Sequence, residues 1–225
     1  MVCLQSIEIS WMEANKIKIS TVIISLLVIA AVEIIVRLAI DQNLVAPLIG
    51  LGVARLAEII FLLMIVKINA KGFSVIGLSS TDVSKGFKKG FIWAVIFGVA
   101  AGVVLFILYR VGINVTTLFQ MRLPANSQEV VAFFFIGAIV APLAEEIFFR
   151  GILYGFFRRW GILTAMILST LLFVLSHSSG QPLPITQLIG GILFAVSYEV
   201  EKNLLVPITI HTLGNLAIFT LAAII

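Results

Sequence analysis

Two adjacent carboxylic acids lie in the middle of one of the most hydrophobic parts of this chain. Glu145 and Glu146 both fall within an apolar stretch that runs from residue 130 to residue 157. An ionised acid at the centre of a membrane-spanning helix costs about 3 kcal/mol even on the more lenient insertion scales. We therefore expect both side chains to face a polar or wet interior, where a carboxylate can serve as a general base.

The spacing of the nearby charges gives the two acids different roles. On a helix, Glu146 and Arg150 are four residues apart and share a face, whereas Glu145 is turned away by about 100°. A single arginine cannot neutralise two carboxylates, so we expect Arg150 to hold Glu146 ionised and Glu145 to stay available for chemistry. The alternative is a purely structural ion pair, which would leave the second acid unexplained.

Two further charge pairs occur in the apolar stretches near the N-terminus. Glu33 precedes Arg37 by four residues, and Arg55 precedes Glu58 by three. Residues at these spacings are neighbours on a helix surface, where opposite charges attract. We expect both to be ion pairs within one helix, with a structural role.

The only two histidines of the chain also lie in or at the end of apolar stretches. His177 ends the stretch 161–177, and His211 lies within the stretch 204–225. If the first of these stretches forms an antiparallel hairpin with the one before it, His177 and the two glutamates are nearly the same number of residues from the turn. They would then lie at a similar depth, which makes His177 a candidate partner of the acids.

Three more residues are placed to complete such a site. Asn215 follows His211 by four residues, so an amide and an imidazole can converge on one oxygen atom; alternatively, the amide joins two helices. Phe173 lies one turn before His177, where its ring can form a wall of the site or simply fill the core. Phe149 belongs to a phenylalanine pair that could line an apolar substrate groove.

The composition shows what kind of element must position these groups. Hydrophobic residues make up 61% of the chain and charged residues only 12%, and the mean hydropathy is +1.19. These values predict an all-α, polytopic transmembrane helix bundle that forms a single integral-membrane domain over residues 1–225. Stretches able to cross about 30 Å of hydrocarbon occur at 17–40, 44–66, 90–109, 130–157, 161–177, 185–200 and 204–225.

Two smaller sequence features concern orientation and packing. Assigning alternate connections to one side of the membrane collects most loop lysines and arginines there, and leaves only Arg110 and Arg122 opposite, which predicts a cytoplasmic N-terminus. This rule accounts for the basic excess, so no nucleic-acid partner is expected. Gly98 and Gly102 form a GxxxG pair that would allow close helix contact.

Three segments of the chain resemble the signature motifs of one membrane protein family. Residues 145–150, 173–177 and 211–215 have the patterns EExxxR, FxxxH and HxxxN, in order and on separate apolar stretches. These patterns are similar to those of the CPBP family, which comprises CAAX prenyl endopeptidases and bacteriocin-processing or immunity-related membrane proteins. The match covers roughly residues 141–215, and none of the signature positions departs from the pattern.

The resemblance implies an intramembrane endopeptidase that cuts a peptide bond near the C-terminus of a membrane-attached or hydrophobic substrate. Such a reaction needs an activated water and a donor to the oxyanion. Glu145 is expected to activate the water and His177 to position or polarise it. The second glutamate and its arginine would hold the arrangement, and the HxxxN pair would donate to the oxyanion.

A metal ion is the open chemical question. Glu145, His177 and His211 could form the carboxylate and two-imidazole set that is common at catalytic zinc. The chain has no HExxH segment, however, so direct catalysis by glutamate is preferred over zinc. The expected partners are the lipid bilayer and a peptide or protein substrate, prenylated or not, and the expected oligomeric state is a monomer.

Two other classes of function compete with a peptidase. A proton-coupled transporter would use the same acids and histidines as a proton relay at mid-membrane. It would need two related halves, and the acid pair has no counterpart in the first three apolar stretches. A non-catalytic protein that gives immunity to a peptide toxin or acts as a membrane adaptor is the second alternative, although intact signature residues argue against it.

Overall fold

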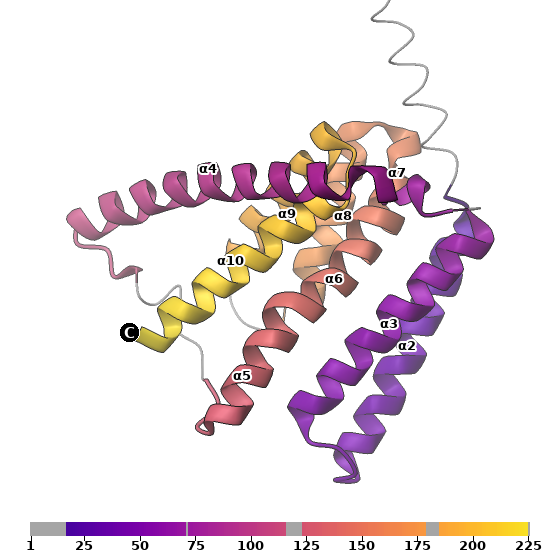
Figure 1. Ribbon diagram of the computed structural model, residues 1–225, viewed down its shortest axis with the longest axis horizontal. Helices are drawn as coiled ribbons and strands as arrows, with labels where there is room; N and C mark the ends of the chain where they lie inside the picture. The colour runs from indigo at the N-terminus through magenta and orange to yellow at the C-terminus, as the bar shows by residue number, and fades with distance from the viewer. Residues whose placement is uncertain (1–16, 71, 116–122, 179–184, 225) are drawn as a thin grey trace, which may run out of the picture.

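The structure is helical throughout the part of the chain that it describes (Figure 1). The computed structural model describes residues 17–70, 72–115, 123–178 and 185–224, and every regular element in these ranges is a helix. The predicted all-α class is therefore confirmed.

The helices follow the apolar stretches of the sequence. The first elements are α2 (Ile19–Asp41), α3 (Pro47–Asn69), the short turns η1 (Phe73–Ile76) and η2 (Ser80–Asp82), and α4 (Val83–Arg110). One long helix follows in six segments: α5 (Ser127–Phe135), η4 (Ile136–Val140), α6 (Ala141–Glu146), η5 (Ile147–Tyr154), α7 (Gly155–Phe157) and η6 (Arg158–Trp160). The last elements are α8 (Ile162–Ser176), α9 (Ile185–Glu201) and α10 (Leu205–Ile224). Each predicted stretch thus contains a helix, although α4 begins ahead of the predicted residue 90.

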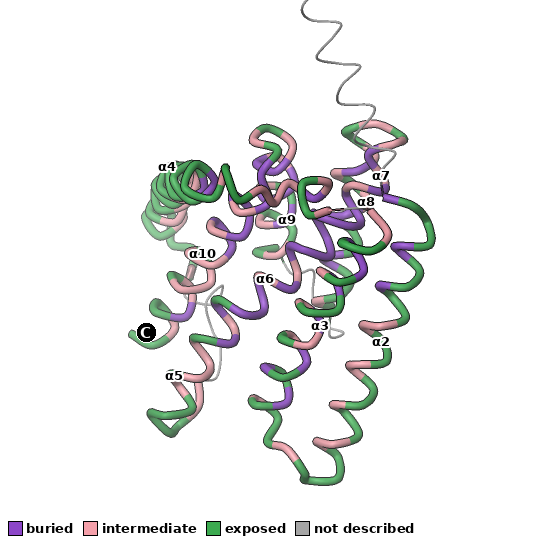
Figure 2. Tube along the Cα trace, turned by 45° about the vertical axis from the view of Figure 1, so that its right-hand side comes forward, coloured by how far each residue is buried: buried purple, intermediate pink, exposed green. Residues whose placement is uncertain are grey.

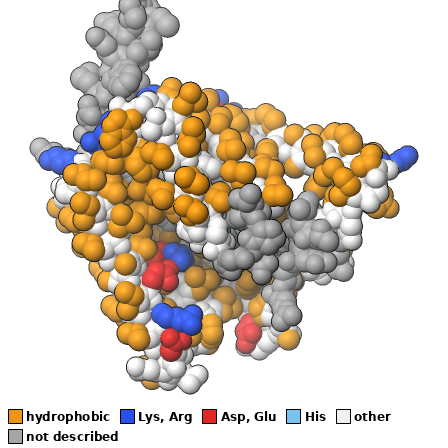
Figure 3. All heavy atoms as spheres, turned by 180° about the vertical axis from the view of Figure 1, so that it is seen from behind, with side chains coloured by type: hydrophobic (Ala, Val, Ile, Leu, Met, Phe, Trp, Pro, Cys, Tyr) orange, Lys and Arg blue, Asp and Glu red, His pale blue; other side chains and the backbone are white. Residues whose placement is uncertain are grey.

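Several of these helices are suited to a bilayer. Five helical segments in the described residues are long and apolar enough to cross a membrane, namely α2, α3, Ser80–Arg110, Ser127–Trp160 and α10, and α8 is a shorter apolar helix. Large hydrophobic side chains are exposed along α2 and α4, whose exposed residues are coloured green in Figure 2, and the face drawn in Figure 3 is largely hydrophobic over its described residues. Lipid tails can cover such side chains without the cost that contact with water would carry. The chain is a multi-pass membrane protein, as predicted.

The core lies around the second half of the long helix. All residues of η5 are buried, and they share one hydrophobic cluster with Leu62 of α3, Phe194 of α9 and Val206 of α10. Helices α2 and α3 pair with each other beside this core, and α4 crosses α10 (Figure 1). The segment that carries Arg150 is therefore enclosed by helices from both ends of the chain.

The long helix has two π-helical segments, one before and one after the pair of glutamates. In η4 the N–H of Ala141 donates to the carbonyl of Ile136, five residues earlier. The next donor in that register would be Pro142, which has no N–H, so the carbonyl of Gly137 lacks a helical partner. A carbonyl in an apolar interior then needs a donor from another element.

Close packing of α4 on α10 depends on glycines other than the predicted pair. A Cβ on Gly98 or Gly102 would meet no described atom within 4 Å, so the prediction for this pair is wrong. The glycines at the contact are Gly86 and Gly90, also four residues apart; a Cβ on Gly90 would lie 2.5 Å from Cβ of Thr209. The GxxxG motif therefore occurs twice in α4, and the position of α10 determines which of the two glycine pairs lies at the helix contact.

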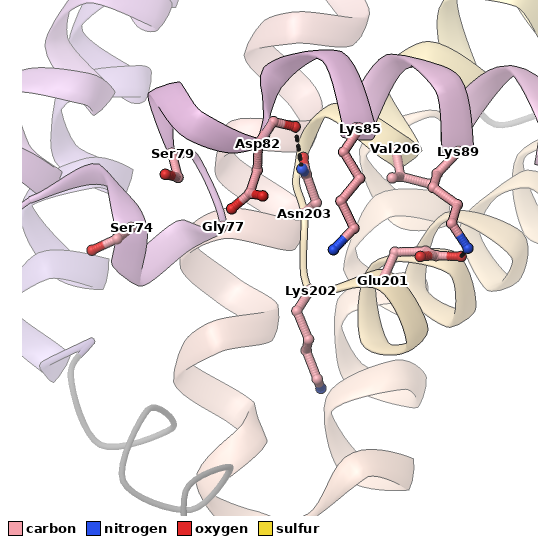
Figure 4. Close-up of a pocket in the computed structure, with 11 residues that line it drawn as sticks. Ser74, Gly77, Ser79, Asp82, Lys85, Lys89, Glu201, Lys202, Asn203 and Val206 are labelled. Carbon is pink, nitrogen blue, oxygen red and sulfur yellow. Dashed lines mark hydrogen bonds and ion pairs between the residues drawn. The ribbon is translucent and has the colours of Figure 1, made fainter.

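Asn203 joins the beginnings of α4 and α10. Its Oδ1 accepts a hydrogen bond from the N–H of Leu205 at 3.0 Å, and its Nδ2 donates to the carbonyl of Asp82 at 3.0 Å (Figure 4). A cavity of about 410 Å³ lies beside it, with Lys85 and Lys89 in its wall. None of the residues of the three sequence motifs lines this cavity, so the candidate site must be sought elsewhere.

Candidate active site

The inner glutamate of the pair is the anchor of the site. Glu146, at the end of α6, is fully buried, and its Oε1 accepts from Nη1 of Arg150 at 3.0 Å and lies 2.8 Å from Nδ1 of His211. The pairing of Glu146 with Arg150 is the one that the spacing predicted. Removing one partner of a buried ion pair typically costs about 3–5 kcal/mol, because the other charge is left uncompensated.

Arg150 is held from several directions at once. Its side chain is fully buried, and Nη2 donates to the carbonyl of Gly191 on α9 at 3.1 Å. The guanidinium carbon lies 4.6 Å from the ring centre of Phe173 and 5.1 Å from that of Phe194. Aromatic faces attract a cation, and more strongly so away from water. The arginine thus connects η5 with α8 and α9.

Gly191 permits this connection because α9 approaches α8 closely. A Cβ at this position would lie 2.9 Å from Cγ2 of Thr170 and 3.3 Å from Cδ1 of Phe173. Any larger residue would push the two helices apart and move the carbonyl that accepts from Arg150.

The outer glutamate faces the two histidines. Oε2 of Glu145 lies 3.7 Å from Nε2 of His177, which directly follows α8, and 3.8 Å from Nε2 of His211 on α10. The Glu145 side chain is 16% exposed, whereas that of Glu146 is 0% exposed. The outer acid is therefore the one that water and substrate can reach.

The hydrogen bonds on the far side of each imidazole fix which nitrogen carries the proton. Nδ1 of His177 lies 2.8 Å from the carbonyl of Phe173, which can only accept, so Nδ1 carries the hydrogen. Nδ1 of His211 likewise faces the Glu146 carboxylate. In the neutral rings both Nε2 atoms are then acceptors that face a third acceptor, Glu145. At 3.7–3.8 Å these contacts are too long for direct hydrogen bonds, and a bridging water can donate its two hydrogens to two of the three acceptors.

Asn215 bonds to the long helix. It lies one turn beyond His211 on α10, and its Nδ2 donates to the carbonyl of Gly137 at 2.9 Å. This is the carbonyl that Pro142 leaves without a helical partner. One amide hydrogen of Asn215 therefore joins two helices, which was the alternative interpretation of the sequence.

The two predicted aromatic residues surround the histidines. Phe173 is 2% exposed, and its ring centre lies 4.5 Å from that of His177, 5.9 Å from that of His211 and 5.2 Å from that of Phe149. Because Phe173 is buried, its ring packs against the two imidazoles and does not face the open cavity. Phe149 is buried as well, but it forms part of the wall of a cavity at the site.

This cavity has a volume of about 270 Å³ and lies between the N-terminal hairpin and the motif-bearing helices. Glu145, Phe149 and His177 line it on one side, and α2 and α3 line it on the other. The charged residues in the wall from α2 and α3 are Glu33, Arg55 and Glu58. The spacing of these residues in the sequence predicts only a structural role, although acids in an apolar stretch were the signal that identified Glu145.

The pairing of these N-terminal charges differs from the prediction in one respect. Arg55 does pair with Glu58, at 2.5 Å. The predicted pair of Glu33 with Arg37 is wrong, because Glu33 lies 2.6 Å from Arg55 and Arg37 lies 3.1 Å from Asp41. Spacing along one helix could not reveal an arginine supplied by the neighbouring helix.

The side chains do not form a ready metal site. Within the described ranges, no group of three or more His, Cys, Asp or Glu side chains is arranged to hold a metal ion. The set of Glu145, His177 and His211 considered for zinc therefore does not fit the ion as it stands, and we derive no step through a metal.

Comparison with known proteins shows which proteins the segment that carries this site resembles. Residues 127–217, which contain all three motifs, match the family model described as type II CAAX prenyl endopeptidase Rce1-like. Among curated proteins, the chain is similar to the membrane-embedded CAAX protease MroQ of Staphylococcus aureus (strain USA300). The two are 32% identical over 97 residues, which are 40% of this chain and 38% of that protein.

Together, the family model and this relative confirm the predicted resemblance to the CPBP family of intramembrane endopeptidases over the segment that carries the site. The match to MroQ spans well under two thirds of that protein. No solved structure matches the chain.

Proposed function

We propose that this protein is an intramembrane CAAX-type endopeptidase that hydrolyses a peptide bond of a membrane-associated substrate with water activated by Glu145. The observation that carries the proposal is the position of one Glu145 oxygen, 3.7 Å and 3.8 Å from two imidazole nitrogens that are held from behind. The family match over the same segment supports the reaction class.

The first step is attack by water. A water molecule between Glu145 and the two Nε2 atoms gives a proton to the carboxylate while its oxygen bonds to the carbonyl carbon of the substrate. The carbonyl π bond opens, and its electron pair becomes the oxyanion of a tetrahedral intermediate. Glu145 then returns the proton to the amide nitrogen as the carbon–nitrogen bond breaks, which releases an amine and a carboxylic acid.

The oxyanion needs donors, and α10 is placed to supply them. Nε2 of His211 can donate to the oxyanion in the protonated ring, in which case the attacking water bonds to Glu145 and to Nε2 of His177, and Glu146 faces Nδ1 on the opposite side of the His211 ring. The second amide hydrogen of Asn215 is the other candidate donor. Each well-placed donor to an oxyanion is worth about 3 kcal/mol of activation free energy. Arg150 acts through Glu146 and is a positioning residue.

The substrate is a peptide or protein in the membrane, and the experiment below compares prenylated with unprenylated forms. A cavity of about 270 Å³ with phenylalanines in its wall suits apolar side chains, with or without a prenyl group. Zinc dependence is a separate alternative, which chelation and metal replacement would reveal.

The test compares wild-type protein with Glu145→Ala in the same membrane, by peptidomics and with tagged candidate substrates, prenylated and unprenylated. We expect products that require Glu145 and that persist in Glu129→Ala, a matched control at an exposed acid of the same long helix. Identical peptide profiles of wild type and Glu145→Ala, with both inserted normally, would reject the peptidase. If Glu145→Ala instead loses ion-dependent uptake, a transporter is favoured. If its phenotype is unchanged, an adaptor is favoured.

A further inference from the structure

A second charged cluster lies in the N-terminal hairpin, outside the segment that matches the family. Glu33 of α2 and Glu58 of α3 both pair with Arg55, at 2.6 Å and 2.5 Å. Charges within apolar helices are costly and mark functional sites more often than not. Figure 3 shows acidic and basic side chains close together within an otherwise hydrophobic face of the molecule.

This cluster shares a cavity with the candidate active site. The cavity of about 270 Å³ has Glu33, Arg55 and Glu58 in one wall and Glu145 and His177 in the other. A substrate whose scissile bond lies at Glu145 therefore brings its neighbouring residues past the hairpin. The cluster is placed to contact them.

One atom of the cluster lacks a partner. Glu58 is only 1% exposed, and its Oε1 has no hydrogen-bond partner in the described residues, while Oε2 pairs with Arg55. Buried polar atoms are nearly always satisfied, and a carboxylate oxygen in a low-dielectric interior is costly to leave alone. Glu58 itself lines the cavity, so a hydrogen-bond donor bound there can pair with this oxygen once the carboxylate turns toward it.

The charge balance indicates what kind of donor fits. Two carboxylates surround one guanidinium, so the cluster carries an excess negative charge when both acids are ionised, and Glu145 is a third acid in the same cavity. Arg55 already donates to both acids. A carboxylate of the substrate would meet two further acids beside the single arginine, whereas an ammonium or guanidinium group would be attracted to those acids.

We propose that Glu33, Arg55 and Glu58 form a cation-accepting subsite that binds a lysine or arginine side chain of the substrate beside the scissile bond. The inference rests on the proposed peptidase and specifies its substrate. Glu58 Oε1 accepts a hydrogen bond from the cationic group, and Glu33, whose side chain is 45% exposed, forms the outer edge of the subsite. Arg55 fixes the two carboxylates.

The test uses the full-length protein in nanodiscs and a set of lipid-anchored peptides in which each position is either lysine or its neutral analogue, norleucine. The ratio of kcat/KM for the two members of each pair is measured for wild type, Glu58→Gln, Glu33→Gln and Asp41→Asn. A ratio is unaffected by partial loss of folded protein. Asp41 is the matched control, because it forms an exposed ion pair on α2 outside the cavity.

We expect wild type to prefer lysine at one position about tenfold or more, the worth of one hydrogen bond to a charged group. The preference should fall toward unity in Glu58→Gln and Glu33→Gln and persist in Asp41→Asn. Cleavage without a basic preference, or a preference that both glutamine variants retain, would overturn the subsite and leave the peptidase standing.

A binding measurement separates failure of the subsite from failure of the peptidase. The same peptide pairs are titrated onto Glu145→Gln, which keeps the cluster but cannot activate water. Tighter binding of the lysine peptide that disappears in Glu145→Gln/Glu58→Gln supports the subsite even if wild type cleaves none of the peptides. Equal binding of both peptides to Glu145→Gln rejects it.

Discussion

The interaction of Glu146 with Arg150 can be separated into a structural part and a catalytic part. Both side chains are fully buried, and Glu146 also contacts His211. Glu146→Gln removes the carboxylate that pairs directly with the buried Arg150, which should lower the free energy of unfolding by about 3–5 kcal/mol. Arg150→Met should be costly as well, because it leaves the carboxylate with only the histidine as a partner.

The double variant Glu146→Gln/Arg150→Met should be more stable than the sum of the single losses predicts. Its interior contains no uncompensated charge, so we expect a coupling free energy of about 2–3 kcal/mol in a double-mutant cycle. Peptidase activity should nevertheless stay at least about a hundredfold below wild type, because His211 has lost the carboxylate that stabilises its charged form.

The assay is reversible unfolding in mixed micelles, followed by activity at matched amounts of folded protein. Additive losses of stability would show that the two side chains do not depend on each other. Recovery of activity together with stability would show that Glu146 serves the fold alone, and that His211 does not act as an oxyanion donor stabilised by this carboxylate.

Three further predictions concern separate parts of the site. His177→Gln should lower kcat by about 10²-fold or more without changing the melting temperature greatly, since Nε2 faces the water position; equal kcat would contradict its role. Gly191→Ala should lower the free energy of unfolding by about 1–3 kcal/mol, because the added methyl overlaps Thr170, and melting in micelles would show it. If glutamate alone activates water, chelator treatment of purified protein should leave activity unchanged, whereas loss of activity that zinc restores would establish a metal enzyme.

The sequence could predict the helices and part of the site because both depend on local rules. Consecutive apolar residues favour a helix in hydrocarbon, so each of the seven stretches contains a helix, although only five helical segments of the described residues are long and apolar enough to cross a membrane. The pairing of Glu146 with Arg150 depends on a four-residue spacing within one helix. The hairpin that brings His177 to the glutamates depends only on the distance of each from the turn at residue 160.

What the sequence could not predict depends on contacts between helices. Glu33 pairs with Arg55 on the next helix and not with Arg37 on its own, because α2 packs against α3 and Arg37 pairs with Asp41. The π-helical register before Pro142 leaves the carbonyl of Gly137 without a helical donor. Its partner, the amide of Asn215, comes from a different helix and could not be read from the local sequence. In both cases, the packing of one helix on another determines which of several suitable groups becomes the partner.

The adjacency of the two glutamates in sequence lets them point in different directions from the same helix turn. Side chains of consecutive helical residues diverge by about 100°, so one acid can be buried while its neighbour faces the cavity. His211 bridges them, with Nδ1 at 2.8 Å from Glu146 and Nε2 at 3.8 Å from Glu145. The anchor that fixes the imidazole therefore also fixes the helix segment that carries the base. An acid moved by one position would lose either the anchor or the cavity, since no rotation of the helix can supply both.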